Sequence, residues 1–295
     1  MSGAGSNPEV SIVVPHYNDL PRLQACLDAL DRQTAERASF EIVVADNRSP
    51  CGLAEVERIA AGRARVIDAP ERGAGPARNA GVAASRGKVL AFTDCDCVPE
   101  PGWLAAGVAA LDSADAIGGR MTVSVGDEAH MSGAEAFERV FAFNNRAYVE
   151  DKGFSVTANL FTTRAVFDAV GPFRVGVSED VDWCRRAVSK GYRLAYAADA
   201  VAAHPARADW AELKRKWQRM NSERFLLEAH GAAGKLKWIG RHLSLPFSIL
   251  AHAPKVASSP DLPDARARLL ALGTLARLRL WRMTNAIGLL AGGAK

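Results

Sequence analysis

Two aspartates separated by one residue, Asp94 and Asp96, directly follow the β-rich run at residues 88–93. Alternate residues of a β-strand point to the same side, so we expect the two carboxylates to bind one hard cation together. Mg²⁺ and Mn²⁺ favour a few carboxylate oxygens plus the phosphates of a bound substrate. The pair therefore predicts a metal-bridged nucleotide diphosphate, and the alternative is a solvated acidic turn.

Two other polar segments follow predicted strands. Asp46 comes directly after residues 43–45, where a carboxylate accepts hydrogen bonds from a base N–H or from ribose hydroxyls, although a lone aspartate there is also an ordinary turn former. The segment 15–18 follows the first strand and offers Tyr17 for stacking or hydrogen bonding. We therefore expect Pro15, Tyr17 and Asp46 to contact a nucleotide.

A glycine-rich stretch at residues 72–81 places glycines in a loop and then Arg78 in the first turns of a helix. Glycines permit close approach of the backbone, and helix N-termini attract anions. The stretch is not a dinucleotide-binding fingerprint, because no G-x-G-x-x-G follows the first strand. The sequence therefore disfavours a Rossmann dehydrogenase and makes Arg78 a candidate contact for a nucleotide sugar.

Acidic residues crowd the start of a helix predicted from Glu179. Such acids complement the helix dipole, and Asp182 is placed to pair with Arg186 four residues on, which accounts for Glu179 and Asp182. For Asp180 the functional interpretation is a general base that deprotonates an acceptor hydroxyl. His204 is either structural or a neutral imidazole that completes the metal site.

The elements that must position these residues alternate between β-rich runs and amphipathic stretches. This order is typical of βαβ units and a mostly parallel sheet. Because ligands bind beyond the carboxyl ends of parallel strands, we expect the three polar segments at one edge of the sheet. Strands are expected at residues 10–14, 40–45, 64–67, 88–93, 116–125, 155–162, 194–196 and 201–203, and helices at 20–32, 52–61, 76–87, 133–148 and 179–191.

The C-terminal third reads as helical and basic. Residues 205–295 carry 16 Lys and Arg against 6 Asp and Glu, whereas residues 1–204 carry 21 against 27. Helices are expected at 210–229, 235–253 and 264–290, and the charge-free stretch 242–254 is too short to span a bilayer. The basic surface suits lipid headgroups or nucleic acid. The 264–290 helix either lies in a membrane interface or packs on the core or a dimer partner.

The composition is that of an ordinary globular protein. The chain has 295 residues, of which 48% are hydrophobic and 24% charged. Nothing near the N-terminus resembles a signal peptide, and five cysteines without a C-x-x-C pair indicate reduced thiols. Cys95 and Cys97 are candidate ligands for a soft metal, but packing of Cys97 and a spacer role for Cys95 is the simpler interpretation. We therefore expect a cytoplasmic protein.

Five segments together resemble glycosyltransferase family 2, whose members have the GT-A fold. They read VVPHYN, VVADN, ARNAG, FTDCD and SEDVD, at residues 13–18, 43–47, 77–81, 92–96 and 178–182. The resemblance implies that Asp46 binds the base, and that Asp94 and Asp96 bind the diphosphate and its Mn²⁺ or Mg²⁺. It further implies that Asp180 is the catalytic base of an inverting transfer and that His204 contacts the metal or diphosphate.

The resemblance also implies a domain organisation. We expect a catalytic domain at residues 8–205, with a nucleotide-binding half at 8–98 and an acceptor-binding half at 99–205, followed by a helical, basic region at 206–295. Glu179 and Trp183 are expected to contact the acceptor or to support the site. Residues 214–220 lack the Q-x-x-R-W signature of processive synthases, which favours the addition of a single sugar.

The expected function is transfer of one sugar from a nucleotide sugar, a UDP-sugar, to a glycan or lipid-linked acceptor. The resemblance implies bacterial surface-polysaccharide assembly at the inner face of the cell membrane. The charge of the C-terminal third, together with the nucleotide-sugar site, favours peripheral membrane contact through the basic helices over a nucleic-acid partner. Two alternatives stay open at this point. One is a nucleotidyltransferase that makes a nucleotide sugar, and the other is a catalytically inert module that binds membrane surfaces.

Overall fold

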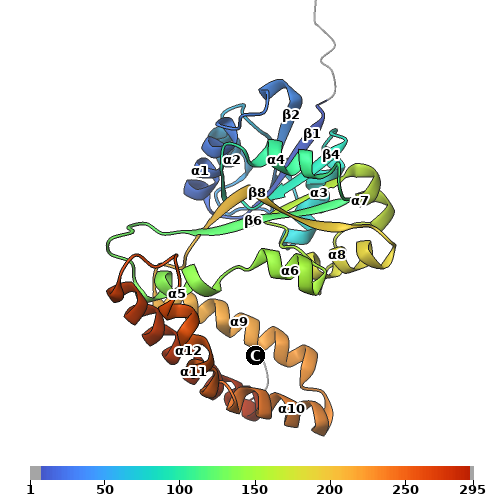
Figure 1. Cartoon of the computed structure of the whole chain (residues 1–295). Helices are drawn as coiled ribbons and strands as arrows, with labels where there is room; N and C mark the ends of the chain where they lie inside the picture. Colours follow the sequence, from blue (N-terminus) through green and yellow to red (C-terminus); the bar gives the residue numbers. More distant parts are fainter. Residues whose placement is uncertain (1–7, 293–295) are drawn as a thin grey trace, which may run out of the picture. The chain divides into compact units, whose positions relative to one another are not determined.

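The computed structural model describes residues 8–292, which form two compact units (Figure 1). The first unit comprises the residues up to Thr122 together with Asn144–His204, and the second comprises Val123–Phe143 and the residues from Pro205 onward. The second unit thus includes a segment, 123–143, that lies inside the predicted catalytic domain of residues 8–205. The predicted division into domains stays a prediction.

An eight-stranded sheet forms the centre of the first unit, in the order β3-β2-β1-β4-β7-β6-β8-β5. Strands β3, β2, β1 and β4 pair in parallel, whereas β7 is antiparallel to β4 and β6, and β5 is antiparallel to β8. The expected α/β fold is confirmed, with parallel pairing among the first four strands. The strands are β1 Val10–His16, β2 Phe40–Asp46, β3 Arg65–Asp68, β4 Val89–Thr93, β5 Val98–Pro99, β6 Ala116–Ser124, β7 Asn159–Thr163 and β8 Leu194–Pro205.

Helices pack against both faces of this sheet. On one face, Phe92 and Leu160 pack with Trp183 in a buried apolar cluster. On the other face the ring of Phe161 lies 4.9 Å from that of Trp103. Neighbouring residues of a strand point to opposite faces, which is why both clusters draw on β7. The helices are α1 Leu20–Asp31, α2 Leu53–Ala60, α3 Ala74–Ala84, α4 Trp103–Ala110, α6 Asn145–Lys152, α7 Arg164–Val170 and α8 Glu179–Ser189, with a 3₁₀ turn at Arg37–Ser39.

Gly81 allows α3 to lie directly on β1. A Cβ atom at this position would stand 2.5 Å from Cγ1 of Val13, so no larger residue fits without a shift of the helix or of the Val13 side chain. The close contact holds α3 firmly against the sheet. This matters for the site, because α3 carries Arg78 and Asn79.

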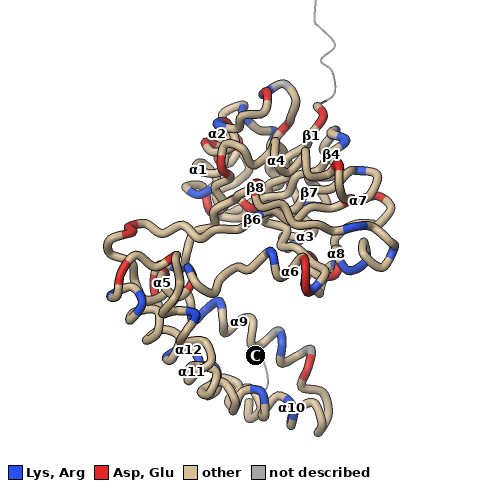
Figure 2. The backbone as a smooth tube through the Cα atoms, in the orientation of Figure 1, with Lys and Arg blue, Asp and Glu red and all other residues tan. Residues whose placement is uncertain are grey.

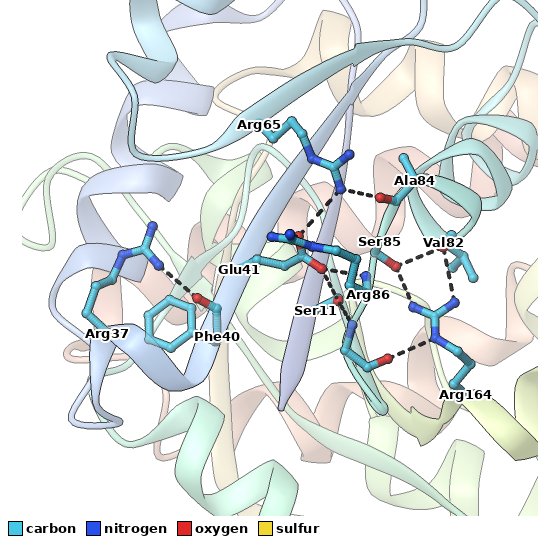
Figure 3. A network of polar contacts seen from close by, with 11 residues as sticks. Ser11, Arg37, Phe40, Glu41, Arg65, Val82, Ala84, Ser85, Arg86 and Arg164 are labelled. Atoms are coloured by element: carbon cyan, nitrogen blue, oxygen red, sulfur yellow. Dashed lines mark hydrogen bonds and ion pairs between the residues drawn. The ribbon is translucent and has the colours of Figure 1, made fainter. Parts of the chain in front are cut away.

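A polar network ties together the beginnings of β1 and β2 and the residues after α3 (Figure 3). Glu41 Oε1 accepts hydrogen bonds from the Ser11 hydroxyl at 2.8 Å and from the backbone N–H of Arg86 at 2.5 Å. Arg65 donates to Glu41 at 3.4 Å and to the carbonyl of Ala84. The network holds the connection from α3 to β4 at the sheet edge remote from the polar segments.

Arg164, the first residue of α7, completes this network (Figure 3). Its guanidinium donates to the carbonyls of Gly87 at 2.8 Å and Val82 at 3.2 Å, and to the Ser85 hydroxyl at 2.7 Å. The last carbonyls of a helix have no partner within the helix. Arg164 therefore donates a hydrogen bond to a carbonyl near the end of α3 and so links this end to α7.

The second unit is built around the long helix α12, which packs against α5, α9, α10 and α11. Its apolar core includes Phe137, Leu213, Leu275 and Leu278. None of the helices among residues 8–292 has a stretch that is long and apolar enough to cross a membrane. The helices are α5 Gly133–Phe141, α9 Trp210–Glu228, α10 Gly231–Leu243, α11 Phe247–Ala257 and α12 Ala265–Gly292.

Most of the predicted elements are confirmed, and three predictions are wrong. The predicted helix at 133–148 is two helices, because the Asn144 side chain accepts from the N–H of Ala147 at 3.3 Å and so starts α6. The predicted helix at 235–253 is also two helices, separated at Pro246, which lacks an N–H to donate. The two short runs at 194–196 and 201–203 form the single strand β8. The sequence reasoning missed β5, α4 and α7.

The hypothesis that the 264–290 helix lies in a membrane interface is also corrected. Leu275 and Leu278 of α12 are buried in the core of the second unit. Trp281 stands edge-on to Trp210 of α9, with 6.4 Å between the ring centroids. The structure thus bears out the alternative, in which this helix packs on the core, because Leu275 and Leu278 find apolar partners on the surrounding helices, while Leu269 and Leu280 stay exposed.

We predict that Arg164→Ala lowers the free energy of unfolding by about 2–3 kcal/mol, because it removes three hydrogen bonds, including the one to the buried carbonyl of Gly87. Chemical denaturation measures this loss. Arg174→Ala is the matched control, since the Arg174 side chain is 63% exposed and lies 3.5 Å from Asp182. That control should change stability by less than about 0.5 kcal/mol. Equal effects of the two substitutions would contradict the role given to Arg164.

Candidate active site

The carboxyl ends of β1, β2 and β4 meet at one edge of the sheet. β1 is parallel to both neighbours, and its last residue, His16, is in register with Asp46, the last residue of β2. Asp94 directly follows Thr93, where β4 ends. The predicted convergence of the three polar segments at one edge is therefore confirmed.

Asp46 lies buried at this edge and is surrounded by donors. Its Oδ1 stands 2.8 Å from Nδ1 of His16 and accepts from the Ser49 hydroxyl at 2.5 Å, while its Oδ2 accepts from the Ser49 N–H at 3.0 Å. Nε2 of His16 accepts from the N–H of Asp19 at 3.2 Å, so the ring proton resides on Nδ1 and points to Asp46. In this structure Asp46 thus orders the loops after β1 and β2, and its contact with a base stays a prediction.

Tyr17 stands next to this buried group with its side chain 59% exposed. Asn18, which follows it, has a left-handed φ of 52° and donates its N–H to the Ser49 hydroxyl at 2.8 Å. Pro15, in contrast, is buried within β1. The turn therefore presents the Tyr17 ring at the edge of the sheet, where an aromatic face is available for stacking.

Asn47 organises the loop that leads from β3 into α3. Its side-chain amide donates to the carbonyls of Ala69 at 2.6 Å and Glu71 at 2.7 Å, and its Oδ1 accepts from the N–H of Gly73 at 2.9 Å. Gly73 precedes α3 and has a φ of 124°, which only glycine adopts readily. Asn47 thus fixes where α3 begins, a role that the sequence reasoning did not assign.

Arg78 connects two acidic segments that lie far apart in the sequence. Its buried guanidinium donates to Oε1 of Glu179 at 2.9 Å and to Oδ1 of Asp94. Burial alone would lower the pKa of Arg78, but the charges of Asp94 and Glu179 outweigh it and raise the pKa. Nε of Arg78 and the hydroxyl of Thr93 are buried without a hydrogen-bond partner among residues 8–292.

The D-x-D segment lies in a turn rather than on a strand, which corrects the geometry expected for it. β4 ends at Thr93, and the N–H of Cys97 donates to the carbonyl of Asp94 at 3.0 Å. The two carboxylates meet different partners: Asp94 contacts Arg78, and Oδ2 of Asp96 lies 3.3 Å from Nε2 of His204 on β8. The turn therefore gives the two aspartates separate surroundings.

The cysteines around this turn are packed side chains. Cys97 is buried, and the Cys26 thiol of α1 contacts the carbonyl of Asp94 at 3.6 Å. Burial, and then the nearby carboxylates, raise the pKa values of Cys26, Cys95 and Cys97. All five cysteines are free. These thiols are protonated at neutral pH, which favours the packing interpretation over soft-metal ligation.

Asp180 stands in the first turn of α8, next to Glu179. Burial raises the pKa of its carboxyl group, the charge of Glu179 adds to the rise, and the N–H of Val181, which donates to Oδ1 at 2.7 Å, opposes it. The predicted pairing of Asp182 with Arg186 is present, with Nε donating to Oδ2 at 2.8 Å. Ser178 occupies the N-cap position but makes no side-chain capping bond there.

Two contacts hold α8 and the preceding loop in place. Trp183 is fully buried, and its indole N–H donates to the carbonyl of Gly171 at 3.1 Å. Asn79 of α3 exchanges two hydrogen bonds with the backbone of Phe173, at 2.8 and 2.9 Å. Trp183 therefore fixes the position of α8, because its ring is buried in the core and its N–H binds the loop before the helix. The roles of Asn79, His16 and Ser49 were missed because they depend on partners distant in the sequence.

Tyr148 of α6 is a further residue near Asp180 that the sequence reasoning missed. Burial, together with the charge of Asp180, raises the pKa of its hydroxyl group. The ring stacks on Phe154 with 5.0 Å between centroids and 13° between planes. No motif marks this tyrosine, so only the packing of α6 in the first unit brings it close to α8.

Comparison with known proteins identifies the chain. Residues 11–180 match the family described as Glycosyl transferase family 2. Glycosyltransferase AglE of Haloferax volcanii is 33% identical over 222 residues, which are 72% of this chain and 71% of that protein. The chain belongs to glycosyltransferase family 2. The resemblance is thereby confirmed, and the enzyme is a glycosyltransferase rather than a nucleotidyltransferase.

Other proteins and solved structures match as well. The Bacillus subtilis protein named uncharacterized glycosyltransferase EpsJ is 38% identical over 92 residues, 30% of this chain and 26% of that protein. Mannosyltransferase PcManGT from Pyrobaculum calidifontis, in complex with GDP-Man and Mn²⁺, has a TM-score of 0.60 and 20% identity, covering 98% of this chain and 89% of that one. S. aureus TarS in complex with UDP-GlcNAc has a TM-score of 0.54 and 17% identity, covering 95% and 88%. The fold of this family 2 enzyme is thus GT-A.

The raised pKa of Asp180 gives a test of its surroundings. The folded state holds this proton more tightly than the unfolded state, so the ionised carboxylate opposes folding once the pH exceeds the raised pKa. Asp180→Asn should therefore raise the melting temperature at about pH 7, and the gain should vanish below about pH 4, where both states are protonated.

Asp182→Asn is the matched control for this measurement. It removes the carboxylate that accepts from Arg186 at 2.8 Å, so it should lower the melting temperature at neutral pH. Thermal unfolding of both variants across this pH range gives the comparison. A decrease in the melting temperature for Asp180→Asn at neutral pH would show that burial does not dominate at this carboxyl group.

Proposed function

We propose that this family 2 enzyme transfers one sugar from a nucleoside diphosphate sugar, a UDP-sugar, to a hydroxyl group of a glycan or lipid-linked acceptor, with inversion at the anomeric carbon. The observation that carries the proposal is the Arg78 guanidinium, which contacts both Asp94 and Glu179. This contact joins the D-x-D turn to the start of the helix that carries Asp180. A candidate donor contact and a candidate base thus belong to one network.

The residues near the turn fit a divalent ion. Oδ2 of Asp96 and Nε2 of His204 lie 3.3 Å apart, and carboxylate oxygen and imidazole nitrogen are both ligands found for Mn²⁺. We infer that these two side chains hold Mn²⁺ or Mg²⁺, with substrate phosphates and water as the other ligands. When bound, the ion supplies positive charge to the diphosphate. The Mn²⁺ in the PcManGT complex supports this inference.

Asp180 acts on the acceptor. Its carboxylate accepts the proton of the acceptor hydroxyl while that oxygen forms a bond to the anomeric carbon. The bond from this carbon to the phosphate oxygen breaks on the opposite face, and the nucleoside diphosphate leaves with the electron pair. Efficient general bases have a pKa near the working pH, and burial shifts that of Asp180 in this direction.

Other residues bind and orient the donor. Arg78 fixes Asp94 beside the sugar or ribose, and its charge stabilises the leaving diphosphate. Tyr17 and Pro15 border the base, with Tyr17 exposed for stacking. We propose that Asp46, which lies buried beside His16 and Ser49, contacts the base. The GDP-Man and UDP-GlcNAc complexes of the two solved neighbours support a nucleotide-sugar donor. A thermal-shift panel of UDP- and GDP-sugars with Mn²⁺ decides between the nucleotides.

We further propose that the enzyme works on the cytoplasmic side of a membrane, on a lipid-linked acceptor of bacterial surface-polysaccharide assembly. The excess of basic residues in the C-terminal third supports contact with an anionic surface. The missing Q-x-x-R-W signature supports the addition of a single sugar. Glu179 and Trp183 support the site, Glu179 through Arg78 and Trp183 by packing under α8.

Asp180→Asn should reduce transfer by about 10²–10⁴-fold, because the neutral amide does not accept the hydroxyl proton. Binding of the nucleotide sugar should change little, since the substitution leaves the donor contacts in place. Initial rates and calorimetric titration measure the two effects. Asp182→Asn, on the same helix, should keep most of the activity. Near-wild-type turnover by Asp180→Asn would show that another group is the base.

Asp96→Ala should abolish the dependence of nucleotide-sugar binding on Mn²⁺, because the ion loses its carboxylate ligand. Calorimetric titration with the nucleotide sugar, with and without Mn²⁺, measures this effect. His204→Ala should weaken the same dependence to a smaller degree, since the carboxylate remains. Asp112→Ala is the control, an exposed aspartate after α4. An unchanged titration for Asp96→Ala would remove the metal role of this residue.

A further inference from the structure

Helices α10 and α11 leave one continuous apolar face exposed. Leu236, Leu243, Phe247 and Leu250 are 71%, 50%, 75% and 77% exposed. They occupy positions i, i+7, i+11 and i+14, which share one side of an α-helix. We call these four residues the 236–250 face.

The opposite side of the same two helices is buried within the second unit. Trp238, Leu245 and Val256 lie there, at positions i, i+7 and i+18, and each is nearly inaccessible to solvent. The turn between the helices preserves this arrangement, because Ser244 and Pro246 both keep right-handed helical angles, with φ/ψ of −79/−10° and −57/−40°. The N–H of Ser248 donates to the carbonyl of Ser244 at 3.3 Å across the turn, and the exposures show that one side of the two helices faces the core while the other faces outward.

Among charged residues, the stretch of chain that contains the 236–250 face carries only basic ones, and one acidic residue from outside it, Glu228 of α9, pairs with Arg241. Residues 229–260 contain no Asp or Glu, and Figure 2 shows Lys and Arg but no acidic residue along α10 and α11. Lys235, Lys237 and Lys255 are exposed and lie beside the apolar positions on the helix, not among them. The exposed residues interspersed with the four apolar ones on that side are small or uncharged: Ala233, Gly240, Ala251 and Pro254.

We propose that the 236–250 face docks on an anionic lipid bilayer, with its apolar side chains among the acyl chains and the flanking lysines at the lipid phosphates. An apolar stripe bordered by lysines is the pattern of helices that lie in the membrane interface. A second copy of the chain fits less well, because a two-fold contact through this face would bring lysines against lysines. The inference deepens the proposed function, since it names the surface that brings the enzyme to a lipid-linked acceptor.

The test is co-flotation of the whole protein with vesicles. Binding is expected to vesicles of phosphatidylcholine mixed with phosphatidylglycerol, to weaken at high salt, and to be much weaker with pure phosphatidylcholine. Lys235→Gln with Lys237→Gln should weaken binding by about 25-fold, because each lysine contributes a factor of about five. Phe247→Ser with Leu250→Ser should weaken it by at least about tenfold.

Two matched controls distinguish this face from others. Leu269→Ser removes an apolar side chain that is 70% exposed on α12, and Lys88→Gln removes an exposed lysine before β4. Both should bind vesicles like the unchanged protein. The proposal is overturned if the protein does not float, if the controls lose as much binding as the face variants, or if the face variants abolish a dimer seen in solution.

Hydrolysis of the nucleotide sugar separates this inference from the proposed function. The face variants should hydrolyse the donor at the rate of the unchanged protein, because the substituted side chains lie outside the site built around Arg78. Loss of vesicle binding with intact hydrolysis supports the membrane surface. Intact vesicle binding with no binding of any nucleotide sugar by the unchanged protein would instead contradict the proposed donor site and leave the docking surface standing.

Discussion

The buried ion pairs of Arg78 are the interaction on which the candidate site depends. A guanidinium withdrawn from water is stable only when carboxylates and hydrogen bonds replace its hydration. Here Asp94 and Glu179 do so, and they come from a turn after β4 and from the first turn of α8. Three segments separated by many residues are thereby held together by one charge. Any change in the length or charge of that side chain disturbs both acidic segments at once.

The position of Arg78 in turn depends on how α3 is fixed. Gly81 lets the helix lie directly against Val13 of β1, and Asn47 holds the loop that leads into it. Arg164 satisfies the carbonyls at its other end. The helix is thus restrained at its start, along its length and at its end. This restraint gives a charged side chain a defined position at the edge of the sheet, as electrostatic stabilisation of a reaction requires.

Much of the first unit could be predicted, because its elements have strong local signals. The buried strands β1, β2 and β4 are continuous apolar runs, and α1 shows apolar residues at helical spacing. The failures have equally local causes. A single Asn144 splits one predicted helix, and Pro246 splits another. The exposed 236–250 face was missed because apolar periodicity alone does not say which side of a helix meets a core.

The sequence by itself determined the family and the order of its motifs, since residues of fixed type at fixed positions carry that information. It also predicted that three motifs follow strands of a mostly parallel sheet and meet at one edge, whereas the order of these strands came from the structure. Only the tertiary structure decided which groups touch: that Asp94 contacts Arg78 while Asp96 lies beside His204, that Asp46 is enclosed by His16 and Ser49, and that α12 is a core helix. The reason is that these contacts join residues far apart in the chain, where short-range patterns contain no information about distance or burial.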